Sequence, residues 1–257
     1  MTKLTVVTAC FNSAKTILDT IVSVNDQTYP DIEHVFVDAG STDNTCELIK
    51  KYSKRDFTLI SEADRGIYDA MNKGFKIAKG DIVAFLNSDD IYDDHNIIEL
   101  VMNKFKRDVD IVYGNIYFVD SQNVTRRTWI TGNVPTKWRS GFQLPHPAFF
   151  MRSTLIKKQE RLFDPTYRIA ADLKLQLSLF KNGTLRYEYL DKYLVKMRLG
   201  GASTKNIWAI LSGFLESRSV YNDIYGNGGL LFATKKILSK LKKKLLTGGT
   251  SYNGENN

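Results

Sequence analysis

The stretch LTVVTACFN, residues 4–12, has the pattern of a strand followed by a polar turn. Its β-branched apolar run is typical of a strand that is buried on both faces of a parallel sheet. The same pattern returns over residues 32–41 and over residues 82–90, IVAFLNSDD. Between these strands apolar residues recur at helical spacing, as in residues 17–24. This alternation predicts βαβ units and an α/β fold whose sheet is mainly parallel.

Composition and charge limit the class of protein. The chain has 257 residues, of which 43% are hydrophobic and 25% charged, as in an ordinary folded protein. Residues 1–204 hold 28 basic and 25 acidic residues, a net charge of +3, whereas residues 205–257 hold 8 and 3, a net charge of +5. A nucleic-acid-binding protein would spread its basic excess over the folded surface, so this placement argues against that class. It predicts a basic C-terminal segment with a role of its own.

Cysteine content and hydropathy bear on the compartment. Cys10 and Cys46 are the two cysteines, too few for a disulfide framework, which favours a reducing compartment. No apolar run approaches the roughly 18 residues that a membrane span needs, and residues 1–6 lead into a strand rather than a signal peptide. We therefore expect a cytoplasmic protein.

Polar residues follow three of the predicted strands. They occupy residues 8–12, 38–41 and 87–90. Ligands bind open α/β sheets beyond the carboxyl ends of the strands, so these turns are candidate site positions. Asp, Asn and Ser also form turns and cap helices, which is sufficient to explain any one of the turns. Three such turns at one edge of a sheet favour a ligand site.

The adjacent carboxylates Asp89 and Asp90 are the most specific of these features. Neighbouring carboxylates repel each other unless a cation holds them, and Mg²⁺ or Mn²⁺ binds one or two carboxylates together with diphosphate oxygens and water. Neither a Gly-x-x-x-x-Gly-Lys-Ser/Thr loop nor a Gly-x-Gly-x-x-Gly motif follows residues 4–10. We therefore expect Mn²⁺ or Mg²⁺ at this pair to carry much of the phosphate recognition.

Four stretches of the chain resemble the family 2 glycosyltransferases, which are inverting enzymes with the GT-A fold that use a nucleotide-diphosphate sugar. These stretches are residues 5–12, 37–43, 64–74 and 85–90. Further segments are similar to acceptor-side elements of the bacterial polysaccharide and O-antigen branch, namely His146, residues 163–165 and 171–172, and residues 200–203. The resemblance covers residues 4–204, and its specificity comes from the order and spacing of all the motifs together.

The resemblance also implies a domain organisation. Residues 1–204 are expected to form a GT-A domain, with a Rossmann-like nucleotide-binding half and a mixed central sheet. Residues 1–95 would bind the nucleotide sugar and residues 96–204 the acceptor. Residues 205–257 would form basic amphipathic helices, of which about the last ten residues would be disordered.

Residue by residue, the resemblance implies a donor site. It places Thr8 and Asp38 in the base and ribose pocket and Arg65 close to the nucleotide. Asp89 would lie near both the ribose and the metal, and Asp90 would bind the metal directly. The resemblance implies a nucleotide-diphosphate sugar, UDP-linked, as the donor, whereas Ala39 stands where many members have a second Asp that contacts the uracil base.

On the acceptor side, Asp172 matches the late Asp that serves as general base in the family. Inverting displacement needs such a base and a cation for the leaving group. Asp172 could also be the N-cap of a helix beginning at Leu173. His146, in a Pro-rich loop that does not favour a buried histidine, would contact acceptor, diphosphate or metal, unless it has a plain loop role. Ser203, in residues 200–204, would belong to a lid over the diphosphate, unless that segment is a simple connection.

The resemblance implies a metal-dependent hexosyl- or N-acetylhexosaminyltransferase. Its acceptor would be a polyprenyl-diphosphate-linked saccharide in the synthesis of bacterial O-antigen, capsule or exopolysaccharide. Two alternatives stay open. A sugar nucleotidyltransferase would need a Gly-rich phosphate loop followed by basic residues, which residues 11–15 do not supply. A catalytically silent GT-A binding protein would not need Asp89, Asp90 and Asp172.

The C-terminal segment carries two apolar stripes at helical spacing. The first is expected to pack on the body and comprises Ile207, Ile210, Leu211, Phe214 and Leu215. The second comprises Ile237, Leu238, Leu241 and Leu245. Six lysines between positions 235 and 244 flank the second stripe, and such a basic amphipathic pattern suits an anionic membrane surface. We expect it to hold the protein peripherally at the inner face of the cytoplasmic membrane.

Overall fold

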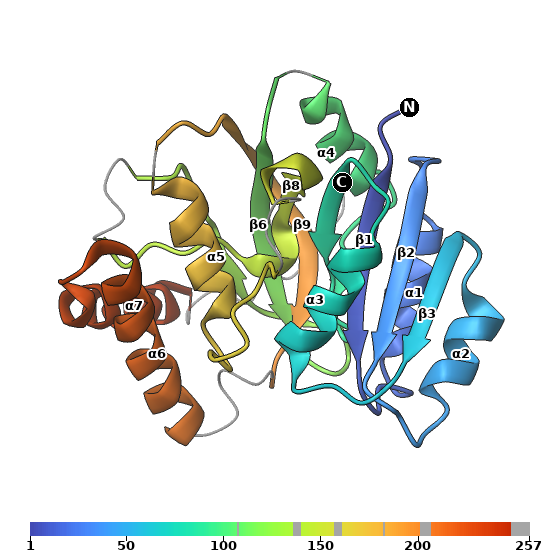
Figure 1. The fold of residues 1–257 in the computed structure, drawn as a ribbon, viewed down its shortest axis with the longest axis horizontal. Helices are drawn as coiled ribbons and strands as arrows, with labels where there is room; N and C mark the ends of the chain where they lie inside the picture. Colours follow the sequence, from blue (N-terminus) through green and yellow to red (C-terminus); the bar gives the residue numbers. More distant parts are fainter. Residues whose placement is uncertain (107, 136–139, 157–160, 182, 201–206, 248–257) are drawn as a thin grey trace.

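The structure is a computed structural model in which a mixed sheet lies between two layers of helices (Figure 1). The last two helices lie on the opposite side of the molecule from the first two (Figure 1). The model describes residues 1–106, 108–135, 140–156, 161–181, 183–200 and 207–247, with side chains in the last helix as far as Ser239. Ser203 and the last ten residues therefore lie outside the described residues, as do the side chains of Leu241, Leu245 and the lysines between them.

The first part of the chain alternates strand and helix. Its elements are β1 (Leu4–Cys10), α1 (Ile17–Asn25), β2 (Ile32–Asp38), α2 (Thr45–Tyr52), β3 (Asp56–Ser61), α3 (Ile67–Ile77), β4 (Ile82–Phe85), β5 (Ile91–Tyr92) and α4 (Ile97–Phe105). Strands β3, β2, β1 and β4 are neighbours in that order and all parallel. The predicted parallel layer is therefore confirmed.

The second part of the chain makes the sheet mixed. Its elements are β6 (Ile111–Val119), β7 (Thr125–Trp129), the 3-10 turn η2 (His146–Ala148), β8 (Phe149–Arg152), the 3-10 turn η3 (Ser153–Leu155), α5 (Ala171–Phe180) and β9 (Tyr187–Arg198). Strand β8 is antiparallel to β4 and to β6, whereas β9 is parallel to β6. Strand β6 is continuous over residues 111–119, although its pairing with β9 shifts register near Gly114.

The two faces of the sheet build separate apolar cores. Side chains alternate along a strand, so Val7 and Phe85 face α3 and α5, whereas Val6 and Ala84 face α4. Helix α3 approaches the sheet closely, because a Cβ atom at Gly74 would lie 2.4 Å from Cγ1 of Val7. This contact fixes the turn before α3 next to the carboxyl ends of the parallel strands.

The β6–β7 hairpin extends beyond that same edge. Phe150 of β8 pairs with Ala84 of β4 on one side and with Val112 of β6 on the other, so β6 and β4 run in the same direction. Residues 116–119 of β6, which pair with β7, therefore lie past the carboxyl end of β4. The hairpin forms a wall beside the space where the sheet ends.

Helices α6 (Ile207–Tyr225) and α7 (Gly229–Thr247) pack against each other, with α6 also against α5 and α7 against β7. Helix α6 is held by its second half, through Ser217, Val220 and Tyr221. The expectation that its first stripe packs on the body is wrong, because four members are strongly exposed: Ile207 (76%), Ile210 (50%), Leu211 (46%) and Leu215 (50%). In the second stripe Ile237 is half-buried and Leu238 is exposed. Across the described residues, every helix is too short or too polar to span a bilayer.

Candidate active site

A cavity of about 1180 Å³ opens at the carboxyl edge of the parallel strands. Parts of all three predicted polar turns line it: residues 9–13, Ala39 and residues 87–89. The opposite walls come from the start of α3, the loop at residues 140–147, the first turn of α5, the β6–β7 hairpin and α7. The cavity therefore brings together residues from both halves of the chain, from Ala9 to Ser239.

Asp89 and Asp90 lie side by side at the end of β4. Asp89 is half-buried and lines the cavity, and Asp90 is buried behind it. Nδ2 of Asn87 donates to Oδ2 of Asp90 at 3.0 Å, whereas Oδ1 of Asp90 is buried with no hydrogen-bond partner among the described residues. Burial raises the pKa of Asp90 well above its ordinary value, and the Asp89 carboxylate adds to that shift. Burial also raises the pKa of Asp89, an effect that Arg198 partly opposes.

This pair fits a divalent cation by its chemistry. A buried carboxylate oxygen without a partner is rare, and a hard cation with oxygen ligands would satisfy it. Within the described part of the chain, no group of three or more His, Cys, Asp and Glu side chains is placed to hold a metal ion. A cation here would therefore use Asp89 and Asp90 and complete its shell with other oxygens, such as those of a diphosphate or water.

Three predicted donor-binding residues lie outside the lining of the cavity. Thr8 is fully buried in β1, with its Oγ1 2.9 Å from Nε2 of His34. Arg65 is exposed, and its backbone N–H donates to Asp69 at 3.1 Å. The third residue, Asp38, is buried at the end of β2. The roles of these residues in donor binding stay predictions.

The carboxylate of Asp38 accepts hydrogen bonds from neighbouring residues of the chain, which favour its ionised form. Its Oδ2 accepts the backbone N–H groups of Gly40 at 3.1 Å and Ser41 at 2.9 Å and the Ser61 hydroxyl at 2.7 Å, while the Ser41 hydroxyl donates to Oδ1. Burial favours the protonated form, but these donors outweigh it and lower the pKa of Asp38. Asp38 therefore fixes the turn that brings Ala39 to the cavity.

Asp172 faces the cavity from the first turn of α5. The helix begins at Ala171 with Ala170 as its N-cap, so the alternative that Asp172 is the N-cap of a helix beginning at Leu173 is wrong. Oδ2 of Asp172 accepts from Nε2 of Gln143 at 2.9 Å. The Tyr68 hydroxyl is shared between the carbonyl oxygen of Ile169 at 2.9 Å and Oδ1 of Asp172 at 3.3 Å. Two side chains from distant elements thus orient a half-buried carboxylate toward the cavity.

His146 lines the cavity close to Asp172. Its ring stacks on Phe85 with 5.3 Å between centroids and meets Phe163 edge-on at 5.5 Å. His146 as a whole is half-buried, in a loop that packs against β4. Nε2 is buried without a hydrogen-bond partner among the described residues. Burial lowers the pKa of His146 although Asp172 opposes the shift, so the imidazole is neutral near pH 7.

Comparison with protein families settles the family of the chain. The model of glycosyl transferase family 2 matches residues 5–170. The chain belongs to glycosyl transferase family 2. It is 32% identical over 132 residues to glycosyltransferase GlyG of Streptococcus pneumoniae, covering 50% of this chain and 44% of GlyG, so it spans about half the length of that relative. It is 27% identical over 209 residues to the putative teichuronic acid biosynthesis glycosyltransferase TuaG of Bacillus subtilis, covering 79% and 82% of the two chains.

Solved structures confirm the GT-A fold of this family 2 glycosyltransferase. Staphylococcus aureus TarS in complex with UDP-GlcNAc matches with a TM-score of 0.70 at 19% identity, covering 98% of this chain and 74% of TarS. The mannosyltransferase PcManGT of Pyrobaculum calidifontis in complex with GDP-Man and Mn²⁺ matches with a TM-score of 0.63 at 16% identity, covering 96% and 79%. The mixed sheet of the predicted GT-A fold is therefore confirmed.

Several lining residues of this family 2 glycosyltransferase were missed from sequence. Tyr68 lies within one of the resembling stretches, but nothing in the sequence indicates its contact with Asp172. Gln143 sits in a segment without periodicity. Arg127 shares one face of a strand with Trp129 in the period-two pattern, a signal that could have found it.

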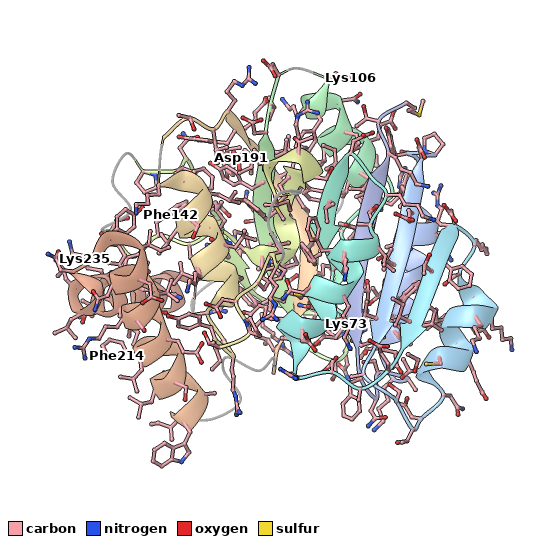
Figure 2. All side chains as sticks on the ribbon, in the orientation of Figure 1. Lys73, Lys106, Phe142, Asp191, Phe214 and Lys235 are labelled. Carbon is pink, nitrogen blue, oxygen red and sulfur yellow. The ribbon has the colours of Figure 1, made fainter. Side chains whose placement is uncertain are left out.

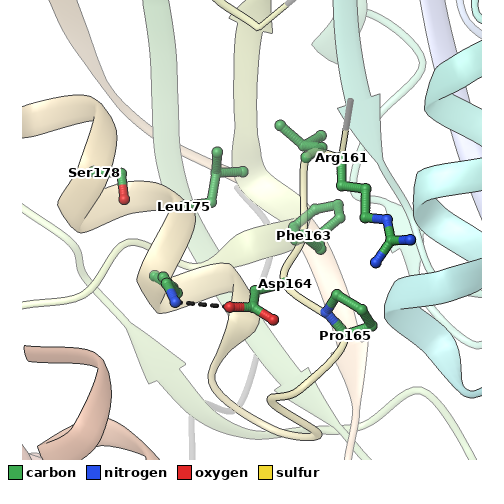
Figure 3. Close-up of a pocket in the computed structure, with 8 residues that line it drawn as sticks. Arg161, Phe163, Asp164, Pro165, Leu175 and Ser178 are labelled. Carbon is green, nitrogen blue, oxygen red and sulfur yellow. Dashed lines mark hydrogen bonds and ion pairs between the residues drawn. The ribbon is translucent and has the colours of Figure 1, made fainter. Parts of the chain in front are cut away.

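A smaller pocket of about 280 Å³ lies between residues 161–165 and α5 (Figure 3). Nζ of Lys174 contacts Oδ2 of Asp164 at 2.7 Å, as the dashed line in Figure 3 shows. Burial favours protonated Asp164, but the lysine and hydrogen bonds from Thr166 outweigh it and lower the pKa of Asp164 to about 2. This ion pair ties the predicted acceptor-side segment to the helix that carries Asp172.

Proposed function

We propose that this family 2 glycosyltransferase transfers a hexosyl or N-acetylhexosaminyl group, with inversion, from a UDP-linked sugar to a lipid-linked saccharide during assembly of a bacterial surface polysaccharide. The observation that carries the proposal is that one cavity is lined by Asp89, beside the unpartnered oxygen of Asp90, and by Asp172 on another wall. Inverting transfer requires a cation site for the leaving group and a separate base for the acceptor.

Donor binding is assigned to residues 1–95, and to Asp89 and Asp90 in particular. These carboxylates would hold Mn²⁺ or Mg²⁺, which supplies counter-charge to a departing diphosphate. The likeness to TarS, which was solved with UDP-GlcNAc, supports a UDP-linked donor. The likeness to PcManGT, which was solved with Mn²⁺, supports a divalent cation. Thr8, Asp38 and Arg65 are proposed to shape the base and ribose pocket.

Acceptor activation is assigned to Asp172. The acceptor oxygen forms a bond to the anomeric carbon as the bond to the diphosphate oxygen breaks, the electron pair leaves with the diphosphate, and the acceptor proton moves to Asp172. Tyr68 and Gln143 hold the carboxylate for this transfer through their hydrogen bonds. The neutral imidazole of His146 could hydrogen-bond the acceptor or the diphosphate, and Ser203 is proposed to belong to a lid.

The products of related enzymes suggest the process. TuaG is named for teichuronic acid biosynthesis, and poly-β-1,6-N-acetyl-D-glucosamine synthase of Staphylococcus epidermidis is a further relative, 39% identical over 88 residues that cover 34% of this chain and 21% of the synthase. Both names refer to the biosynthesis of polysaccharides. A polyprenyl-diphosphate-linked saccharide is the acceptor that we propose for this chain.

Peripheral contact with the cytoplasmic face of the membrane is part of the proposal. The first half of α6 exposes a large apolar face, to which Trp208 adds a side chain that is 72% exposed. An anionic bilayer is the proposed occupant of this face, because residues 205–257 carry a net charge of +5 and Trp favours the interface of a bilayer. This assigns the membrane contact to α6 as well as to the basic stripe of α7.

A transfer assay tests the proposed function. Purified protein is incubated with Mn²⁺, a panel of UDP-sugars and a synthetic prenyl-diphosphate-linked N-acetylhexosamine, and glycosylated product is measured by mass spectrometry. We expect product with at least one donor and its loss in excess EDTA. Hydrolysis of a donor without transfer to any acceptor, or full activity in EDTA, would contradict the proposal.

A further inference from the structure

One face of the β6–β7 hairpin lines the large cavity mainly with apolar side chains. Two cross-strand pairs share this face, because side chains alternate along each strand. They are Ile116 with Trp129 and Phe118 with Arg127. The Phe118 and Trp129 rings are parallel, with an interplanar angle of 5° and 6.5 Å between centroids. Met197 of β9 pairs with Phe118 and also lines the cavity. Arg127 is therefore a single charge on an otherwise apolar wall.

The guanidinium of Arg127 has no counter-charge within the described part of the chain. Its Cζ lies 3.9 Å from the centroid of the Phe118 ring, and burial lowers its pKa. None of the ion pairs among the described residues includes Arg127. The preceding residue, Arg126, lies on the opposite face, is exposed and forms an ion pair with Asp120. Removing a charge from water is costly without a partner, so an anion in the cavity would gain from contact with Arg127.

Helix α7 brings a second cation to the same cavity. It packs beside β7. Its backbone lies so close to Gly141 that a Cβ atom on this glycine would lie 2.4 Å from the backbone nitrogen of Lys236. Lys236 is half-buried and lines the cavity, and its Nζ donates to the Ser217 hydroxyl at 3.0 Å. Lys235 is exposed, and Figure 2 shows it on the outside of α7. Of these two lysines, Lys236 lines the cavity and Lys235 does not.

We propose that Arg127 and Lys236 bind a phosphate group of an amphiphilic acceptor whose apolar chain lies along Phe118 and Trp129. This inference rests on the proposed function, because it assigns the anion to the acceptor. A phosphate beside an apolar chain matches two cations beside an aromatic wall. A nucleotide sugar has no apolar chain to cover that wall, and its diphosphate is assigned to the cation site at Asp89.

Binding of farnesyl diphosphate to the full chain tests the inference without turnover. Its dissociation constant is measured by isothermal titration calorimetry for wild type, Arg127→Ala and Lys236→Ala, with Arg126→Ala and Lys235→Ala as matched controls. We expect each cavity substitution to weaken binding about tenfold or more, because each removes a charge-assisted contact. The control variants should bind within about twofold of wild type, since exposed charges contribute little. Thermal unfolding identifies any variant that fails to fold, and Arg127→Gln, which removes the charge but keeps a long polar side chain, then replaces Arg127→Ala.

Two further probes separate the possible sources of the phosphate. Inorganic diphosphate should bind more weakly than farnesyl diphosphate, and UDP with Mn²⁺ should bind wild type and Arg127→Ala equally. Three results would each overturn the inference. They are an equal loss of affinity for farnesyl diphosphate in Arg127→Ala and Arg126→Ala, no binding of farnesyl diphosphate to the wild type, or a loss of affinity in Arg127→Ala for UDP alone. Binding that depends on Arg127 without any sugar transfer would support this subsite and contradict the proposed function alone.

Discussion

Replacing Asp172 with Asn should separate catalysis from stability. The substitution keeps the size of the side chain and one acceptor oxygen, so one of the two hydrogen bonds from Tyr68 and Gln143 can survive. Loss of the other should cost roughly 1–2 kcal/mol of unfolding free energy. An amide cannot accept the acceptor proton, and loss of general-base catalysis lowers a rate by about 10²–10⁴-fold, which is about 3–5.5 kcal/mol in barrier height. The effect on transfer should therefore far exceed the effect on folding.

Three measurements follow from that separation: the rate of transfer, the dissociation constant for the donor, and the unfolding midpoint in urea. We expect Asp172→Asn to lose transfer at least about a hundredfold while donor binding stays within about twofold. Asp223→Asn is the matched control, because it breaks an ion pair with Lys174 of the same helix outside the large cavity. Transfer by Asp172→Asn within tenfold of wild type, or an equal loss of transfer in the control, would refute the assignment of Asp172 as the base.

Three other outcomes are expected. Asp90→Ala should lower the rate of transfer about a hundredfold or more, and its residual rate should not depend on the Mn²⁺ concentration. Mn²⁺-dependent activity in this variant would contradict the assignment of Asp90 as a metal ligand. The pKa of Asp164 is lowered to about 2, so its contribution to folding is complete above the ordinary pKa of Asp and is lost as the pH falls toward 2. Asp164→Asn should therefore reduce the unfolding free energy by roughly 1–2 kcal/mol at pH 7 and by less at pH 3, and an equal difference in urea unfolding at both pH values would contradict this cause. Trp208→Ser combined with Leu211→Ser should reduce sedimentation with anionic liposomes, whereas Val22→Ser on α1, also exposed, should not; equal sedimentation of all three proteins would refute the membrane face of α6.

The parallel half of the fold could be predicted from sequence because its strands are buried on both faces. Strands such as residues 4–10 are then continuous apolar runs that no other element explains as well. Strand β9 was missed because Tyr187 to Arg198 mixes aromatic and charged residues on a partly exposed strand. The four residues of β8 were missed because they follow directly on a Pro-rich segment. In both cases tertiary pairing with β6, rather than local pattern, decides the structure.

Site residues could be predicted where carboxylates lie within short sequence motifs. Asp89 and Asp172 were chosen from sequence, and the structure brings both to one cavity. The contacts that orient Asp172 were not predictable, because Tyr68 is about a hundred residues away and local spacing carries no information on such pairs. Helical spacing likewise predicted α6, but periodicity does not tell which half of a helix meets the body.

The stereochemistry of the transferred sugar tests the central claim most directly. The protein is incubated with Mn²⁺ and the α-configured UDP-sugar that it accepts, and the anomeric configuration of the purified product is determined by proton NMR. Transfer in one displacement, with Asp172 as base and no carboxylate nucleophile, predicts a β-linked product that is absent in EDTA. An α-linked product, or the same product in EDTA, would contradict the account.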